Sequence, residues 1–294
     1  MSNRLGVLKT YKIFIGGKFS RTESGRFFKL NVNKKPVANV CLSSRKDLRN
    51  AVVVAREAFP NWSLASAYNR SQILYRMAEM MESRKAQFVE ELILQGLDEI
   101  SANNEINISI DRVIYFAGWA DKLNQVFGAV NPVSSSYLNF SLLEPMGVVG
   151  ILAPETPGLL GIVTALCQVV ISGNTCVVIA SDLFPLSAIT LAEVIATSDF
   201  PNGVINILTG SKNEIVPHLA KHMDVKALYL NDINKEFTKS VQMQAVNNLK
   251  RIILPEDFNW HEESCENPYT IIKFMEIKTT WHPIENISET GLRY

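Results

Sequence analysis

Apolar and polar residues alternate at the start of the chain, first in the run YKIFIGGKF (11–19) and then in RFFKLN and PVANVCL. A period of two residues predicts β-strands, because successive side chains of a strand point to opposite faces. The pair Gly16-Gly17 falls between two such runs and predicts the turn of a hairpin. The chain is therefore expected to begin with a β-hairpin and a further short strand.

The period changes between Ser44 and about Leu97, where apolar residues lie three and four positions apart. This spacing predicts two amphipathic helices, the second of them long, with Ser44 and Ser66 as N-caps and Gly96 as the stop. The same pattern continues over 101–128 and predicts a third helix that ends near Gly128. Met77, Met80 and Met81 form a stripe on the second helix, which is typical of core packing.

Short apolar runs and helical segments alternate between Val148 and Leu230. Strand followed by helix, repeated, predicts parallel βαβ units with right-handed crossovers. One more helix (FTKSVQMQAVNNL) and one more strand (KRIILP) follow, and a β-prone run, YTIIKFMEIKTTWHPI, lies near the end of the chain. The predicted fold class is α/β, with an open parallel sheet and flanking helices.

The composition limits which classes of partner and which cellular compartment are expected. Lys plus Arg and Asp plus Glu both number 29, and the basic residues are scattered, so nucleic acid is not an expected partner. The N-terminus has no apolar run typical of a signal peptide, and PGLLGIVTALCQVVIS is too short for a membrane span. The chain has 4 cysteines without a CxxC pair, at positions 41, 167, 176 and 265. We therefore expect a cytoplasmic protein with reduced thiols and no membrane contact.

Eight sequence blocks follow one another along the chain: YKIFIGGKF, AFPNW, RSQILYRMAEMMESR, YFAGWADK, EPMGVVGILAP, GNTCVVIAS, PNGVINILTG and NNLKRIIL. In their order and spacing they resemble the aldehyde dehydrogenase superfamily. The resemblance covers roughly residues 10–255. The step from NNLKRIIL to a tail that contains KTTWHPI is most similar to the truncated second module of family-16 aldehyde dehydrogenases.

This resemblance implies an open α/β nucleotide-binding domain with an N-terminal helical layer and a β arm, and without the catalytic domain. The expected organisation is a β-hairpin segment over 1–44, an NAD(P)-binding-type domain over 45–255, and a tail with an oligomerisation arm over 256–294. Family-16 modules of this kind usually follow another module. Whether the sequence is whole or the C-terminal part of a longer protein therefore stays open.

The catalytic positions that the resemblance implies have lost their chemistry. The family reaction needs an activated cysteine thiolate, and no cysteine lies in a matching context. Cys265, near His261 and Glu262, is read as an incidental loop cysteine. The position of the general base is Pro255, and the neighbouring Glu256 would point to the opposite face of a strand.

The position of the oxyanion-binding asparagine is Thr156, which is read as a turn residue capping the following helix. It follows Glu155, where the family has tryptophan. The resemblance places the cofactor pyrophosphate near the N-terminus of a helix that begins near Pro157.

The implied cofactor contacts are degenerate as well. Ala180 stands where a lysine usually binds the ribose, which leaves Asp182 as the polar residue able to accept a ribose hydroxyl. Lys212 and Glu214 follow Gly210 in place of glycines, and the segment 231–236 adds further carboxylates. Carboxylates at a pyrophosphate site repel it. Thr156, Asp182 and Gly210 remain as the degenerate cofactor-binding candidates; no cofactor is assigned, and NAD or NADP is possible through the resemblance alone.

Two groups of residues contain types that can bind metal ions. His218 and His222 lie four residues apart on a predicted helix, as zinc-binding histidines do, but no third ligand follows them in the sequence. The loop HEESCE (261–266) mixes soft and hard ligands. Surface histidines and a solvated loop explain both patterns, so no metal is predicted.

Three functions fit these observations. The favoured one is a pseudoenzyme scaffold that assembles with itself or with a full-length aldehyde dehydrogenase module, through the β-prone run near the C-terminus. The second is an NAD(P)-dependent oxidoreductase acting on the aldehyde group of donors, completed by a partner module. The third is a nucleotide-binding module that uses the cofactor cleft.

Overall fold

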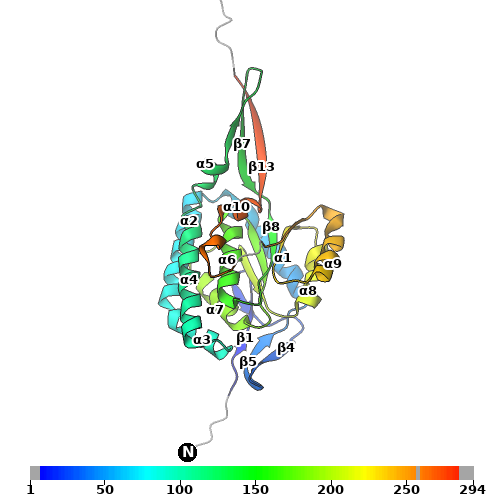
Figure 1. The fold of residues 1–294 in the computed structure, drawn as a ribbon. Helices are drawn as coiled ribbons and strands as arrows, with labels where there is room; N and C mark the ends of the chain where they lie inside the picture. The colour runs from blue at the N-terminus through cyan, green and yellow to red at the C-terminus, as the bar shows by residue number, and fades with distance from the viewer. Residues whose placement is uncertain (1–6, 256–258, 285–294) are drawn as a thin grey trace, which may run out of the picture.

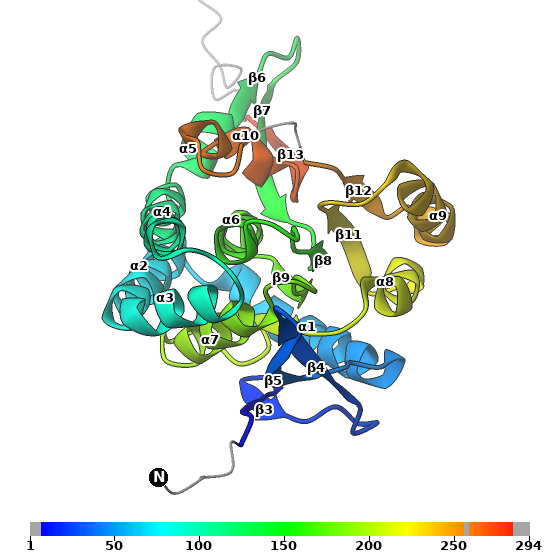
Figure 2. The same cartoon turned by 60° about the horizontal axis from the view of Figure 1, so that its bottom comes forward.

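The fold was analysed in a computed structural model that describes residues 7–255 and 259–284. Its centre is a sheet of 7 strands in the order β12-β11-β8-β9-β10-β2-β3 (Figures 1 and 2). The strands are β2 (Ile13–Ile15), β3 (Lys18–Ser20), β8 (Val148–Leu152), β9 (Thr175–Ile179), β10 (Ile205–Leu208), β11 (Val225–Leu230) and β12 (Arg251–Ile253). Strands β8 to β12 run parallel, as the alternation of strand and helix predicts.

The N-terminal hairpin forms as expected. β2 and β3 pair antiparallel around Gly16-Gly17, and β2 also pairs with β10 and so extends the central sheet. A second, small sheet holds β1 (Thr10–Tyr11), β5 (Lys35–Cys41) and β4 (Phe27–Val32). The central sheet thus contains strands from both sides of the predicted boundary at residue 44. The division into 1–44, 45–255 and 256–294 stays a prediction.

Helices cover both faces of the sheet (Figure 2). On one face, α6 and α7 lie against the strands and α2, α3 and α4 form a second layer; α1, α8 and α9 cover the other face. Their bounds are α1 (Arg45–Leu64), α2 (Ala67–Ser83), α3 (Lys85–Leu94), α4 (Glu99–Ala117), α6 (Gly158–Ile171), α7 (Pro185–Ile195), α8 (Lys212–Lys221) and α9 (Lys235–Ala245). Every residue of β8, β9 and α6 is buried, which is why these segments show no polar face in the sequence.

The predicted N-caps are confirmed. Ser44 and Asp47 form a capping box at the start of α1, and the Ser66 side chain accepts the N–H of Asn69 at the start of α2. Met77 and Met81 are fully buried, so the methionine stripe belongs to the core. The caps and the stripe were readable from the sequence because each depends on residues within one or two helical turns.

The extents of the second and third predicted helices were wrong. The second one ends at Ser83, where Arg84 leaves the helical backbone, and resumes as α3. Arg84 reaches Glu193 on α7 at 3.0 Å. Periodicity did not reveal this break, because α2 and α3 both turn apolar residues toward the same core.

The third helix also differs from the prediction. It begins after Asp98, whose carboxylate accepts the N–H of Ser101, and it ends at Gly118. A separate short helix, α5 (Leu123–Phe127), then ends at the predicted stop, Gly128. The two helices contribute to one amphipathic pattern, so the sequence alone did not separate them.

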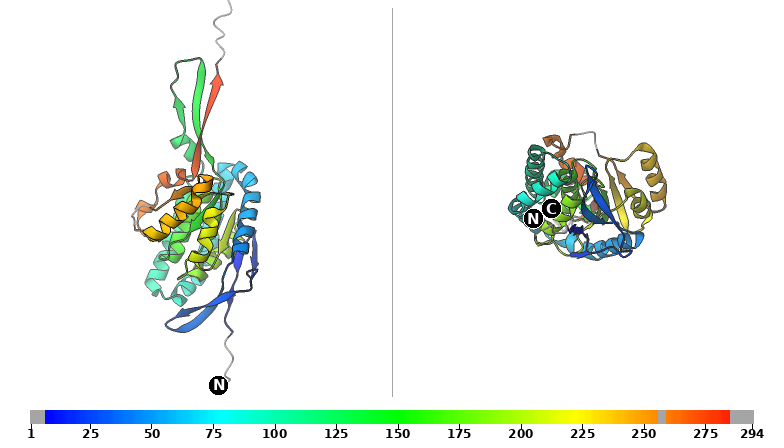
Figure 3. Two further views of the ribbon diagram at one scale, coloured as in Figure 1. Left: turned by 90° about the vertical axis from the view of Figure 1, so that its right-hand side faces the viewer. Right: turned by 90° about the horizontal axis from the view of Figure 1, so that it is seen from below.

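A β arm extends away from the body of the molecule (Figure 3). It is a sheet of 3 strands in the order β13-β7-β6, from β6 (Ala129–Asn131), β7 (Tyr137–Pro145) and β13 (Met275–Pro283). β13 pairs antiparallel with β7 along its whole length, from Met275 opposite Pro145 to Pro283 opposite Tyr137. The β prediction from Tyr269 onward was too long, because residues of this run first form the short helix α10 (Pro268–Ile272).

Among the described residues, no helix combines the length and the apolar composition that a membrane span requires.

Candidate functional site

The carboxyl ends of the parallel strands form the edge at which α/β sheets usually bind ligands. Four polar residues meet there: Glu155 after β8, Asp182 after β9, Lys212 at the start of α8, and Asp232 after β11. The backbone N–H of Glu155 donates to Asp232 Oδ2 at 2.7 Å. The residues were far apart in sequence, and the parallel sheet brings them together.

Glu155 is the centre of this group. Its carboxylate forms an ion pair with Lys212, and its Oε2 accepts the Ser181 hydroxyl and the Asp182 backbone N–H, both at 2.9 Å. Lys212 Nζ also donates to the carbonyl of Ala153 at 2.6 Å. The side chain of Lys212 is 10% exposed and that of Glu155 is 28% exposed, so the pair lies largely out of water.

The pKa values of Glu155 and Asp182, two of the three carboxylates at this edge, shift in opposite directions. Burial acts to raise the pKa of Glu155, but the hydrogen bond and charge of Lys212, with Ser181, outweigh it and lower the pKa. Burial and the nearby negative charge of Glu155 raise the pKa of Asp182 to about 6, although Lys212 opposes the shift. The surroundings of Asp182 thus disfavour its ionised form.

The space left at this edge is small. The cavity beside Glu155, Asp182 and Lys212 measures about 220 Å³. Ligand pockets generally measure about 300–1,000 Å³. The Glu155–Lys212 ion pair thus lines a cavity that is smaller than a usual ligand pocket.

The other cofactor candidates lie elsewhere. Gly210 is buried with φ of 135°, and a Cβ there would lie 2.9 Å from the backbone nitrogen of Ser43, so close packing accounts for the glycine. Glu214 points away and pairs with Arg26 at 2.6 Å. In the segment 231–236, Asn231 is buried and donates to the carbonyl of Leu152, and Asn234 caps α9.

The N-terminus of α6 is capped by a carboxylate from another helix. Oε1 of Glu105, on α4, accepts the backbone N–H groups of Leu159 at 2.7 Å and Leu160 at 3.1 Å. Glu105 is 3% exposed, and burial raises its pKa although both N–H groups oppose the shift. Since the N-cap Pro157 offers no side-chain bond, Glu105 satisfies these donors, and they are not free for a pyrophosphate.

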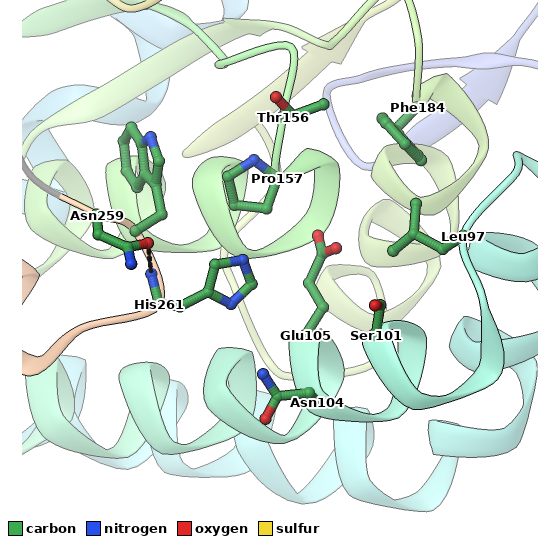
Figure 4. A pocket seen from close by; sticks show the side chains of 10 residues that line it. Leu97, Ser101, Asn104, Glu105, Thr156, Pro157, Phe184, Asn259 and His261 are labelled. Carbon is green, nitrogen blue, oxygen red and sulfur yellow. Dashed lines mark hydrogen bonds between the residues drawn. The ribbon is translucent and has the colours of Figure 1, made fainter.

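Thr156 lines a larger cavity of about 650 Å³ (Figure 4). Its walls come from α4, from the turn before α6, and from the C-terminal segment, where Trp260 and His261 lie. In Figure 4 the Glu105 carboxylate points into this space beside Pro157. The family position of the oxyanion donor thus lies at a cavity. The predicted capping role of Thr156 was wrong, because Pro157 is the N-cap of α6 and Glu105 accepts the first N–H groups of the helix.

The C-terminal segment is held over this cavity by Arg112 of α4. The guanidinium donates to the carbonyls of Trp260 at 3.3 Å and Glu262 at 3.1 Å, and Nε lies 3.4 Å from the Glu266 carboxylate. Arg112 is 1% exposed. The hydroxyl of Tyr115 adds a bond to the carbonyl of Glu266 at 2.6 Å.

The candidates for nucleophile and base offer no activated group. All 4 cysteines are buried and unpaired. Burial raises the pKa of Cys167, Cys176 and Cys265, and the Cys265 thiol donates to the carbonyl of Asn259 at 3.1 Å. Pro255, half-buried just after β12, has no group that could accept a proton. Glu256 lies outside the described residues.

The two histidines do not form a metal site with neighbours. His218 lies in α8, and His222 follows as its C-cap, 4.0 Å from Asp224. Within residues 7–255 and 259–284, no group of three or more His, Cys, Asp or Glu side chains has the arrangement to hold a metal ion.

Asp182→Asn tests how the raised pKa of Asp182 affects the stability of the protein. A raised pKa means that Asp182 stabilises the fold below its ordinary pKa of 3.8 and that this contribution is lost as the pH rises through about 6. Asp182→Asn is therefore expected to stabilise the protein at pH 8 and to change little at pH 4. The gain should be only about 0.5–1 kcal/mol, because the carboxylate is partly desolvated while the residue as a whole stays in contact with water, which screens the charge. Urea unfolding at both pH values measures this; a variant that is less stable at pH 8 would contradict it.

Sequence reasoning missed two of these roles. Glu105 lies on the buried face of α4 together with Ala102, Ile106 and Ser109. A charged residue in the apolar positions of an amphipathic helix was the available signal, because such a residue must find a partner. The sequence shows Glu155 only as a departure from the tryptophan of the family. No pattern among its neighbours in the sequence predicts its ion pair with Lys212.

Comparisons with known proteins show the family of the chain. The family model described as aldehyde dehydrogenase family matches residues 23–256. The chain is 30% identical over 265 residues to cytosolic 10-formyltetrahydrofolate dehydrogenase of Mus musculus, covering 85% of this chain and 29% of that protein. It is 31% identical over 250 residues to mitochondrial aldehyde dehydrogenase of Leishmania tarentolae, covering 83% of this chain and 49% of that protein.

Solved structures give the same result. An NAD+ complex of aldehyde dehydrogenase from Bacillus cereus superposes with a TM-score of 0.78 at 26% identity, over 83% of this chain and 50% of that one. HpcC from Thermus thermophilus gives a TM-score of 0.79 at 26% identity, over 83% and 48%. The chain thus spans about half the length of these solved relatives.

Proposed function

The chain belongs to the aldehyde dehydrogenase family, as its sequence blocks indicated, and from that premise we propose that it is a non-catalytic scaffold. It assembles with itself or with a catalytic aldehyde dehydrogenase module. The α/β fold of the family is present, but fold alone does not carry an activity, which depends on the groups at the site. The likeness to a family-16 second module remains the finer prediction.

The Glu155–Lys212 ion pair is the observation that carries this proposal. It ties together the ends of the strands at the edge where the family fold would hold NAD or NADP. A pyrophosphate there would meet the carboxylates of Glu155, Asp182 and Asp232 beside a cavity of about 220 Å³. Negative charge next to negative charge disfavours binding, so these residues do not fit the cofactor.

The thiols support the same proposal. Acyl transfer through sulfur needs an accessible cysteine with a lowered pKa. Cys265 is 1% exposed with a raised pKa, and Cys167 and Cys176 lie in the core. Four buried, unpaired cysteines also fit a reducing compartment, and we place the protein in the cytoplasm on that ground.

The β arm is the surface we propose for assembly. Two large apolar side chains on β13 face solvent, Ile277 at 73% exposed and Trp281 at 57%. β13 is also the edge strand of its sheet and can pair with a further strand. The other exposed apolar residues of the arm are Val130, Tyr137, Leu138 and Leu142. Apolar groups gathered on a projecting edge are typical of a contact with another chain.

Replacing both Ile277 and Trp281 by lysine tests the assembly. The residues lie on one side of β13, so the variant places charge on that side and leaves the β13–β7 register intact. We expect the oligomer of the wild type to dissociate, as measured by light scattering after size exclusion. The matched control replaces exposed Met243 and Val246, away from the arm, by lysine. A wild type that is monomeric alone and with a full-length relative would refute the assembly role.

The absence of catalysis has its own test. We expect the purified chain to form no NADH from NAD and a panel of aldehydes, and NAD or NADP to leave its thermal midpoint unchanged. NADH formation that is lost in Cys265→Ser would overturn the proposal. NADH formation only when a full-length relative is added, beyond the rate of that relative, would favour the alternative of an oxidoreductase completed by a partner.

One observation favours a second candidate function. The cavity at Thr156, of about 650 Å³, lies within the usual range for small-ligand pockets, whereas the cofactor cleft does not. A ligand-binding module would therefore use the Thr156 cavity. A thermal shift with AMP that Thr156→Trp abolishes would support this candidate over the scaffold without ligand.

A further inference from the structure

A third cavity lies apart from the two already described, between the start of α1 and the end of α8. It measures about 320 Å³. Both helices cover the same face of the sheet and pack against each other (Figure 2). The cavity is thus separated from the Thr156 cavity, which lies on the α4 and α6 side of the sheet.

The basic residues of this cavity come from matching helical positions. Arg45 and Arg49 stand four apart on α1, with Leu48 between them at the floor. His218, Lys221 and His222 have the same spacing at the end of α8. Residues at i, i+3 and i+4 share one helix face, so the guanidinium groups of Arg45 and Arg49 and the ammonium group of Lys221 line one space.

These charges are not balanced by neighbouring carboxylates. Arg45, Arg49 and Lys221 form no salt bridge or side-chain hydrogen bond within the described residues. Asp224 lies 4.0 Å from His222 but already pairs with Arg56 at 3.4 Å.

A further positive charge lies next to the cavity. Lys250 Nζ donates to the carbonyl of His222 at 2.7 Å. Burial and the charge of Lys226 lower the pKa of Lys250 to about 8, as expected where positive charge is in excess.

We propose that the α1–α8 cavity binds the phosphate group of a small molecule that also carries an apolar part. Arginine forks bind phosphate oxygens bidentately, and lysine adds a point charge. Leu48 and Met223 provide apolar surface below and beside these groups. The surplus of cations that makes this a poor metal site, despite the two histidines, favours an anion instead.

Titration of the full chain with phenyl phosphate tests the proposal. In about 50 mM salt we expect a Kd of about 0.1–1 mM. Arg49→Ala/Lys221→Ala removes two charges from the cavity and is expected to weaken binding by at least about tenfold. The matched control, Lys235→Ala/Lys239→Ala on α9, removes two exposed charges elsewhere and should bind as the wild type does.

The other probes separate the sources of the effect. Phenol should not bind, and inorganic phosphate should bind more weakly than phenyl phosphate, because only the latter uses both parts of the cavity. Equal weakening in the two double variants would mean unspecific charge attraction and would overturn the proposal. The proposal would also be overturned if Arg49→Ala/Lys221→Ala bound phenyl phosphate with the wild-type affinity, or if phenyl phosphate did not bind at all. Vesicles that contain a phosphoinositide are the last probe, and binding to them alone would overturn it too.

Discussion

Lys212→Ala is expected to lower the free energy of unfolding by about 2–3 kcal/mol, because removing one partner of a largely buried pair leaves the other charge without compensation. Glu155 would keep its bonds from Ser181 and Asp182 but would lose its cation, and the carbonyl of Ala153 would lose its donor. The partial exposure of Glu155, at 28%, keeps the cost below that of a fully buried pair. Urea unfolding at pH 7 measures the loss.

Two controls separate the ion pair from the loss of side-chain packing. Lys212→Met/Glu155→Gln removes both charges and keeps the shapes. The carbonyl of Ala153 loses its donor in both variants, so the double variant should be more stable than Lys212→Ala by the cost of the uncompensated charge. Lys46→Ala breaks a pair with Glu23 in which both side chains are 52% exposed, and should cost less than about 0.5 kcal/mol. A Lys212→Ala variant as stable as Lys46→Ala would show that the pair does not hold the edge.

The pH dependence of this loss follows from the lowered pKa of Glu155. A carboxylate with a lowered folded-state pKa stabilises the protein above its ordinary pKa of 4.5, and this contribution is lost as the pH falls through the lowered value. The difference between the wild type and Lys212→Ala should therefore be full at pH 7 and shrink in acid. A difference that grows below pH 4.5 would contradict the assignment.

Arg112→Leu is expected to release the C-terminal segment from α4 and to cost about 3 kcal/mol. Leucine fills the buried space, but the carbonyls of Trp260 and Glu262 lose their donor and the Glu266 carboxylate loses its cation. Urea unfolding gives the global loss. Hydrogen exchange of the amides in 259–266 should speed up more than exchange in the sheet, because the lost bonds are local.

The comparison for this variant is Arg76→Leu. Arg76 pairs with Glu79 on the surface of α2, where the two side chains are 47% and 64% exposed. Arg76→Leu should therefore lower the free energy of unfolding by less than about 0.5 kcal/mol. If Arg112→Leu leaves exchange in 259–266 unchanged, other contacts hold the segment. The Tyr115 hydroxyl, bonded to the carbonyl of Glu266, would then be the group to replace.

The site was only partly readable in advance. Asp182, a predicted cofactor contact, lies beside Glu155 at the carboxyl ends of the parallel strands. Gly210 was expected to face a cofactor, whereas its position against the Ser43 backbone explains the glycine by packing. Whether Thr156, Asp182 or Gly210 contacts any ligand stays a prediction. The capping of α6 by Glu105 was not foreseen, because α4 and α6 are joined only by the tertiary fold.

The sequence by itself determined the alternation of strands and helices, the caps at Ser44 and Ser66, and the family resemblance. These features depend on neighbours a few residues away, where the period of apolar positions records which face is buried. The tertiary structure alone decided that Lys212 neutralises Glu155 and that Arg112 holds the C-terminal segment. Such pairs form because parallel strands end at one edge and helices share a core, and no local pattern encodes which distant charges then meet.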